Sequence, residues 1–249
     1  RACAAGLFLG SVLIACSTPA ASTQSSSTVA NASVSRAPTG RPPCPAGPER
    51  GGTCLGVLAA GTYSTTSFMP SITYTVPEGG WGNWEDREGI FVLLPPGETF
   101  AGLEADTSDW IGVFHSVGAV RPGCDEEVEP GVVTVKELTR WFARQPGLAV
   151  TKPQPISVGG LNGVMIDLSL ASGWTNTCPL PFPDVPLVNV LMGTGPSEGL
   201  GVLVEASWTT RLYLLDFDGG NIAIYVMDHP GRFSLEEYDA VVRTIQFDR

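Results

Sequence analysis

Residues 195–199 contain a match to the nucleophile motif G-x-S-x-G, centred on Ser197. Asp216, Asp228 and His229 follow in the chain order that an α/β-hydrolase would use. In such enzymes the serine stands on a sharp turn between a strand and a helix. Here the residues after Ser197 predict another strand, so we interpret the motif as a turn between strands and expect no catalytic residue.

Histidine chemistry is restricted, because the chain has only His115 and His229. Two histidines leave few routes to a general base or to a histidine metal cluster. His115 shares a strand face with Ile111 and Val113, so we expect it to be packed. His229 stands beside Pro230-Gly231, and we interpret it as a turn residue. We expect no cofactor.

Carboxylates gather at two places where a cation could bind. The densest run is Asp125, Glu126, Glu127 and Glu129, which lacks the regular spacing and the glycine of an EF-hand and is interpreted as a solvated acidic loop. Residues 216–221 also have the character of a calcium loop, but a β-hairpin explains the same residues. We expect no metal site, with calcium as the alternative.

Four tryptophans in or near predicted loops are the candidate binding residues: Trp81, Trp84, Trp110 and Trp174. Indole rings can stack on sugars or fill the groove of a partner. Packing into the core is the alternative for each of them, because tryptophans are usually mostly buried. Trp141 and Trp208 are assigned to the core.

Leu13-Ile14-Ala15-Cys16 has the form of a bacterial lipobox. Arg1 and an apolar run over residues 6–14 precede it, and a Ser/Thr/Ala-rich stretch follows, which is the order of a lipoprotein signal. A short buried helix or a membrane span is the alternative, but the run has about half of the roughly 20 residues that a span needs. We predict a signal peptide over residues 1–15, lipidation of Cys16, and a location on the outer face of the cytoplasmic membrane.

Composition divides and constrains the rest of the chain. Residues 16–43 carry the lipidated cysteine and then a disordered Ser/Thr/Ala/Pro tether with almost no large apolar side chain. Residues 44–249 can form a single extracytoplasmic globular domain.

The formal net charge of −11 argues against nucleic acid as a partner. Anionic head groups would also repel such a surface, so the expected contact with the membrane is made through the lipid. A Lys-poor chain rich in Ala, Gly and Pro indicates a high-GC organism, and we expect an actinobacterium.

The four cysteines outside the signal region predict two disulfides. They are Cys44, Cys54, Cys124 and Cys178, and sequence alone permits three pairings. We favour Cys44–Cys54, which closes a short Pro/Gly loop, together with Cys124–Cys178, which ties the acidic loop to a Pro-rich loop. Zinc is the competing interpretation, but no C-x-x-C pair and no nearby histidine support it.

Apolar periodicity predicts a strand-rich domain with two helices. The clearest hairpin pairs residues 211–217 with 221–227 through Asp218-Gly219-Gly220, and both of its faces are apolar, as in a central hairpin covered on both sides. Capping boxes beginning at Thr134 and Ser234 open the two helices. Seven further strands are expected near residues 57–66, 71–76, 89–94, 110–117, 163–170, 186–192 and 200–207.

This arrangement resembles uncharacterised actinobacterial cell-surface lipoproteins whose domains look like the Mog1/PsbP superfamily. The residues that carry the resemblance, besides the lipobox, are Gly61-Thr62-Tyr63, Thr73-Tyr74-Thr75-Val76-Pro77, Gly80-Trp81, residues 158–163 and Thr244-Ile245-Gln246-Phe247. The resemblance implies an α+β fold in which two helices cover an antiparallel sheet in an α/β/α-type layered arrangement.

We therefore expect a membrane-anchored, non-enzymatic lipoprotein that binds either a small or lipid-like ligand or an envelope protein partner. An apolar cleft between sheet and helix would favour a lipid-like ligand, whereas a flat patch of tryptophans and acidic residues would favour a protein partner. A hydrolase of cell-envelope components is the alternative function.

Overall fold

The computed structural model describes residues 55–99, 101–102, 108–124, 126–179, 184–206, 208–229 and 233–248, all within the compact unit of residues 38–249. The signal peptide, Cys16, the tether, Cys44 and Cys54 lie outside the described residues. Short strands dominate the chain, and the helices are α2 (Val135–Phe142) and α3 (Leu235–Val242), with a 3-10 turn η1 at Gly195–Ser197.

The strands, in chain order, are β1 (Gly56–Val57), β2 (Gly61–Ser64), β3 (Ile72–Val76), β4 (Gly82–Arg87), β5 (Ile90–Leu94), β6 (Trp110–His115), β7 (Val117–Ala119), β8 (Leu148–Val150), β9 (Gln154–Val158), β10 (Leu161–Leu170), β11 (Leu187–Gly193), β12 (Gly201–Glu205), β13 (Thr209–Phe217), β14 (Gly220–Asp228) and β15 (Gln246–Phe247). The expected strand at 57–66 is wrong as a single element, because residues 58–60 separate β1 from β2. Strands β4, β8, β9 and β15 were not predicted, and β7 was predicted only at Val117, the last residue of the strand expected at 110–117.

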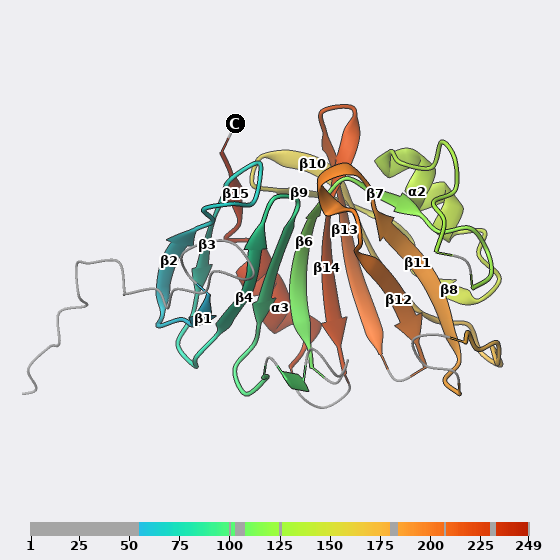
Figure 1. The fold of residues 1–249 in the computed structure, drawn as a ribbon, viewed down its shortest axis with the longest axis horizontal. Helices are drawn as coiled ribbons and strands as arrows, with labels where there is room; N and C mark the ends of the chain where they lie inside the picture. The colour runs from blue at the N-terminus through green and yellow to red at the C-terminus, as the bar shows by residue number, and fades with distance from the viewer. Residues whose placement is uncertain are drawn as a thin grey trace, which may run out of the picture. The chain divides into compact units, whose positions relative to one another are not determined.

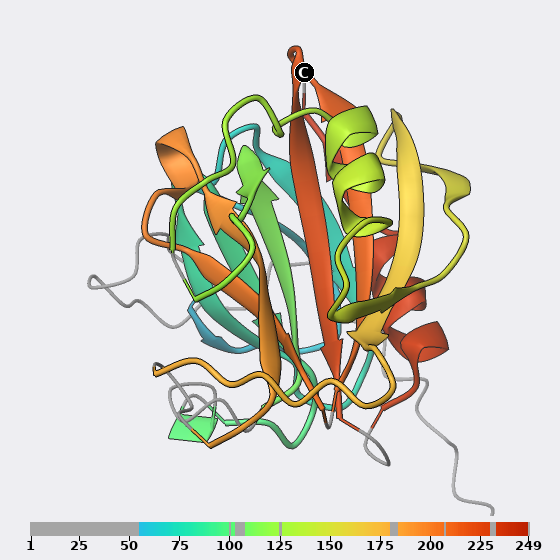
Figure 2. The same ribbon diagram turned by 90° about the vertical axis from the view of Figure 1, so that its right-hand side faces the viewer.

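A nine-stranded antiparallel sheet forms the middle layer, in the order β1-β4-β5-β6-β14-β13-β10-β8 with β9 also paired to β10. Figure 1 looks onto this sheet. Each face is covered by one helix and one three-stranded sheet. Helix α3 and the sheet β15-β3-β2 contribute to one core, and α2 and the sheet β12-β11-β7 contribute to the other. In Figure 2 the orange strands β11 and β12 lie to the left of the central hairpin and the red helix α3 to its right. The predicted fold class is confirmed.

The central hairpin forms as expected from its sequence. Strands β13 and β14 pair from Thr209↔Asp228 to Phe217↔Gly220, so the turn itself is Asp218-Gly219. Both turn residues have positive φ, 45° and 76°, which a two-residue hairpin turn requires and which glycine adopts without strain. Alternate residues of β13 face opposite cores: Leu212 and Leu214 join the α2 side, and Tyr213 and Leu215 join the α3 side.

Both helices begin at the predicted capping boxes. Thr134 and Ser234 each accept a hydrogen bond from the backbone of the glutamate three residues later, and that glutamate bonds back. These contacts lower the pKa of Glu137 and of Glu237, through the Thr134 hydroxyl and the Ser234 backbone respectively. Val135, Leu138 and Phe142 of α2 and Tyr238, Val241 and Val242 of α3 are buried. Trp141, which was assigned to the core, is only partly buried, as is Leu235.

Candidate functional site

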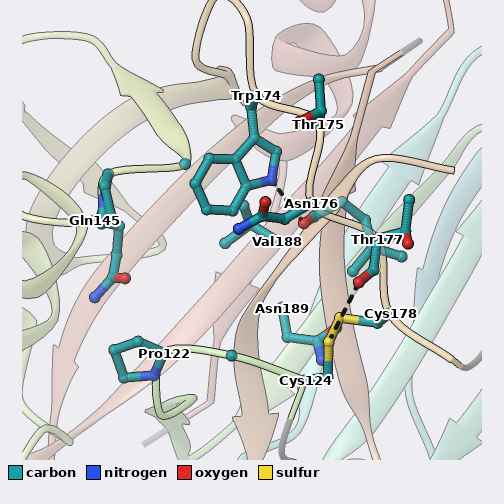
Figure 3. Close-up of a pocket in the computed structure, with 14 residues that line it drawn as sticks. Pro122, Cys124, Gln145, Trp174, Thr175, Asn176, Thr177, Cys178, Val188 and Asn189 are labelled. Carbon is teal, nitrogen blue, oxygen red and sulfur yellow. Dashed lines mark hydrogen bonds between the residues drawn. A yellow bond between two sulfur atoms is a disulfide. The ribbon is translucent and has the colours of Figure 1, made fainter.

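A cavity of about 440 Å³ opens where α2 and β8 meet the start of β11. Figure 3 shows its lining side chains. We call it the Trp174 cavity, and it is lined by Pro122, Gly123, Cys124, Gln145, Pro146, Gly147, Trp174, Thr175, Asn176, Thr177, Cys178, Leu187, Val188 and Asn189. Its size lies within the roughly 300–1,000 Å³ that is usual for small-molecule sites. None of these described lining residues carries a charge.

The loop 171–178 that forms one wall of the cavity is fixed by backbone contacts. Ala171 donates to the carbonyl oxygen of Gly147 at 2.9 Å, and Leu187 donates to that of Asn176 at 3.1 Å. Thr177 also forms an antiparallel bridge with Pro186. The wall is therefore preorganised, which reduces the entropy lost when a ligand binds.

Trp174 is held in one orientation at the centre of this wall. Its indole Nε1–H donates to the carbonyl oxygen of Leu187 at 3.0 Å. A Cβ at Gly147 would lie 2.8 Å from Cε2 of the indole and 2.5 Å from a methyl group of Val188. Glycine at position 147 is thus what allows the ring to approach the backbone so closely. Of the four candidate binding tryptophans, only Trp174 lines this cavity.

A disulfide joins Cys124 to Cys178 and connects two walls of the cavity. The structure agrees with the pairing favoured from the sequence. Because both sulfur atoms form the disulfide, they are not available as zinc ligands. The partner pair Cys44–Cys54 lies outside the described residues, so that pairing stays a prediction.

Three side-chain amides reach the cavity, those of Gln145, Asn176 and Asn189. Among the residues that the structure describes, no hydrogen bond to any of these amides is present. Each amide offers both donors and an acceptor. No sequence pattern indicates these three amides, because glutamine and asparagine are common in loops and the three come from separate segments of the chain.

The other candidate tryptophans pack against the two cores. Trp81 is 2% exposed and contacts Phe233 and Tyr238, so its ring is not available to a ligand. Trp84 and Trp110 are partly buried against the α2-side core, with Trp110 between Phe114 and Tyr225. For these three residues the packing alternative describes the structure better than the binding interpretation. Trp208 is buried as expected.

Ser197 is a structural residue of the turn η1. Its side chain is fully buried, and Oγ lies 2.6 Å from the carbonyl oxygen of Gly89 and 2.7 Å from that of His115. The hydroxyl proton is therefore directed to backbone oxygens rather than to a base. The interpretation of residues 195–199 as a turn between strands is confirmed, since η1 connects β11 to β12.

The two histidines have different environments. His115 is half-buried in β6 and meets Phe217 edge-on, as expected for a packed residue. The interpretation of His229 as a turn residue is incomplete: its Nδ1 lies 2.5 Å from Oδ1 of the buried Asp109, which also accepts from the His229 backbone at 2.8 Å. Asp109 and His229 are 120 residues apart in the chain, so no local motif could reveal this pair.

Asp228 and Tyr238 belong to the same polar cluster as Asp109 and His229. Burial, together with the negative charge of Asp109, raises the pKa of Asp228 to about 6. Burial and the same carboxylate also raise the pKa of Tyr238 far above its ordinary value. The cluster connects the start of β6, the end of β14 and helix α3, and it favours the protonated form of Asp228.

A second buried network centres on Arg211. Its guanidinium forms a bidentate pair with Asp167, at 2.7 and 2.9 Å, and bonds Asp239 of α3 at 3.0 Å. Tyr213 donates to the other oxygen of Asp239. The hydrogen bond to Asp167 raises the pKa of Arg211 still further, so the guanidinium is always charged. This network connects β10, β13 and α3.

The acidic segments show no cation site within the described residues. Glu127 pairs with Arg121, and Asp125 lies outside the described part of the chain. In the segment 216–221, considered above as a calcium loop, the side-chain amide of Asn221 hydrogen-bonds the backbone of Val117 and Val133. In the residues described, no group of three or more His, Cys, Asp or Glu side chains is arranged to hold a metal. No described helix is long and apolar enough to cross a membrane.

Comparison with known proteins finds distant structural neighbours, of which two are described. No protein-family model matches the chain, and no curated protein matches it. The solution structure of PsbP (CyanoP) from Synechocystis sp. PCC 6803 has a TM-score of 0.36 and 13% identity, covering 79% of this chain and 98% of that one. A crystal structure from Bacteroides thetaiotaomicron VPI-5482 has a TM-score of 0.31 and 12% identity over 72% of this chain. This chain spans only 45% of the Bacteroides protein. At these values neither neighbour indicates what this protein binds.

Proposed function

We propose that this chain is a non-enzymatic binding protein that holds a small ligand in the Trp174 cavity. The observation that carries the proposal is the combination of a fixed indole with three side-chain amides that have no partner in the described part of the chain. Ligand sites typically combine an apolar or aromatic wall with a few convergent polar groups. A disulfide and two prolines stiffen the remaining wall.

The sequence supports an extracytoplasmic address for this binding protein. We infer that Cys16 carries the lipid, and that the tether holds the domain close to the outer face of the cytoplasmic membrane. The membrane is then contacted through the lipid rather than through the acidic domain surface, which would be repelled by anionic head groups. A disulfide between Cys124 and Cys178 is compatible with such an oxidising location.

The alternatives considered from the sequence have less support. A lipid-like ligand needs a long apolar space, whereas the described lining of the Trp174 cavity includes three amides and two threonines. A protein partner usually needs a contiguous apolar patch, but the large apolar side chains exposed among the described residues are Val57 and Met69. A hydrolase based on Ser197 would require that buried hydroxyl to reach a substrate.

Native mass spectrometry of the full chain with Cys16→Ser, purified from the envelope of its own host, tests the cavity. We expect a defined adduct that is lost in an Asn189→Trp variant, because the larger side chain fills the cavity. Gln246→Trp, at an exposed amide on β15, is the matched control and should retain the adduct. An adduct that survives Asn189→Trp, or a bare protein throughout, would contradict the proposal.

The anchor has a separate test. Radiolabelled palmitate should enter the wild-type protein in its host and should not enter Cys16→Ser. Label in the Cys16→Ser variant, or no label in the wild type, would show that the address is wrong without affecting the cavity.

A further inference from the structure

We infer that the ligand of the Trp174 cavity is a neutral saccharide. This inference rests on the proposed function, because it names the chemical class of the molecule that the cavity would hold. It is carried by the charges, the hydrogen-bonding groups and the aromatic surface of the lining, which each restrict the ligand in a different way.

The absence of charge in the lining restricts the ligand first. Among the residues that the structure describes, fourteen line the cavity and none of these is Asp, Glu, Lys, Arg or His, although 39 of the 249 residues of this chain are Asp, Glu, Lys or Arg. An ionised ligand would lose its hydration there without gaining an opposite charge, which is costly. An uncharged ligand avoids this cost.

The free amides restrict the ligand further. Gln145, Asn176 and Asn189 each present an NH₂ group and a carbonyl oxygen, with no bond to another described residue. An anion would satisfy only the NH₂ groups, and a hydrocarbon would satisfy neither group. A hydroxyl both donates and accepts, so a ligand with several hydroxyls pairs with all three amides. The hydroxyls of Thr175 and Thr177 extend the same polar lining.

The indole of Trp174 supplies the third restriction. Its orientation is fixed by the bond to Leu187 and by the contact with Gly147, so it forms a rigid aromatic wall before any ligand arrives. Aromatic rings bind flat apolar surfaces with little loss of conformational entropy. A sugar ring combines a C–H face for the indole with a rim of hydroxyls for the amides, and it carries no charge.

The test is a set of ¹H–¹⁵N spectra of the full chain with Cys16→Ser, followed at the indole N–H of Trp174. The neutral probes are glucose, galactose, mannose, N-acetylglucosamine and their disaccharides. Matched charged probes are glucuronate and glucosamine, and short prolyl peptides and octanol represent the other classes. We expect a neutral saccharide to shift the Trp174 signal, and the charged analogue of the same sugar to bind at least about 10-fold more weakly.

Variants assign the binding to the lining. Asn176→Ala and Gln145→Ala should each lower the affinity for the saccharide by about 3- to 10-fold, the usual effect of losing one hydrogen bond. Gln246→Ala should leave this affinity unchanged. A charged, peptidic or apolar probe that shifts the Trp174 signal when no saccharide does would overturn this inference and leave the proposed function standing. No shift with any probe, in protein whose mass spectrum also lacks an adduct, would overturn both.

Discussion

Ser197 shows how a catalytic motif can be occupied by a structural residue. Its hydroxyl lies within hydrogen-bonding distance of two backbone carbonyl oxygens, and the turn around it is packed so closely that a Cβ at Gly89 would lie 2.3 Å from the backbone of Pro196. In the sequence, the strand predicted after the motif is the feature that indicates a structural role for Ser197. Gly89 lies in the turn between β4 and β5 and His115 ends β6, so both carbonyl partners are far away in the chain.

Removing the Ser197 hydroxyl should therefore affect stability rather than chemistry. We expect Ser197→Ala to lower the free energy of unfolding by about 1–3 kcal/mol, because a buried hydrogen-bonding group is lost. Glu198→Ala, at an exposed neighbour, should change it by less than about 0.5 kcal/mol. Urea denaturation measures both. Hydrolysis of envelope material that disappears in Ser197→Ala, with unfolding unchanged, would instead support the enzyme alternative.

Asp228 gives the fold a pH dependence of known sign. Its pKa is raised to about 6 from an ordinary 3.8, so the folded state binds the proton more tightly than the unfolded state. The stabilisation is complete below about pH 4 and is lost as the pH rises through 6. Above pH 6 the ionised carboxylate faces the carboxylate of Asp109 at a partly buried position.

Asp228→Asn should consequently stabilise the protein at pH 8 by about 1 kcal/mol, after allowance for partial solvent screening, and should have little effect at pH 4.5. Asp216→Asn, an exposed carboxylate on the partner strand, is the control at both pH values. Chemical denaturation is the measurement. Equal effects of Asp228→Asn at the two pH values would show that the raised pKa does not influence folding.

Elements whose signals are local were predictable, and elements that depend on distant pairing were not. The capping boxes and the Asp218-Gly219 turn each act within a few residues, so both helices and the central hairpin follow from the sequence. Strand β4 has the polar sequence GNWEDR. It is a strand because it lies between β1 and β5 and because Asp86 accepts hydrogen bonds from the backbone of residues 66–68.

The Arg211 network also depends on residues that are far apart in the chain. Through Asp167 and Asp239 it attaches α3 to the sheet. We expect Arg211→Met to lower the free energy of unfolding by about 3–5 kcal/mol, because Asp167 and Asp239 would keep their charges without a partner. Arg140→Met, at an exposed site on α2, should have almost no effect. If Arg211→Met and Arg140→Met are equivalent in urea denaturation, the network does not hold α3 in place.

At the scale of the whole molecule, the sheet topology brings the candidate site together. Segments 122–124, 145–147, 174–178 and 187–189 are far apart in the chain and meet in the folded domain, where β7 pairs with β11 in one sheet and β8 pairs with β10 in another. From residue type, Trp174 was one of four candidate tryptophans, and Cys124–Cys178 belonged to the favoured one of three permitted sets of pairings. The three amides could not, because nothing in their own sequence surroundings indicates where they converge.

The disulfide connects this site to overall stability. We expect the double variant Cys124→Ser/Cys178→Ser to lose about 2–4 kcal/mol of unfolding free energy, since the bridge closes a loop across a separation of 54 residues. The strands and both cores of this variant should remain. Its affinity for the ligand should fall, because two cavity walls are no longer joined. Reductant should reproduce these effects in the wild type. A double variant with unchanged ligand affinity would show that the bridge does not shape the cavity.

The central claim is that the Trp174 cavity is the binding site. The most direct measurement is an experimental electron-density map of the full chain with Cys16→Ser, purified from its host and carrying its adduct. The account predicts density for a bound molecule against Trp174, within hydrogen-bonding distance of Gln145, Asn176 or Asn189. An empty cavity in a preparation whose mass spectrum retains the adduct, or density for the molecule elsewhere on the surface, would contradict it.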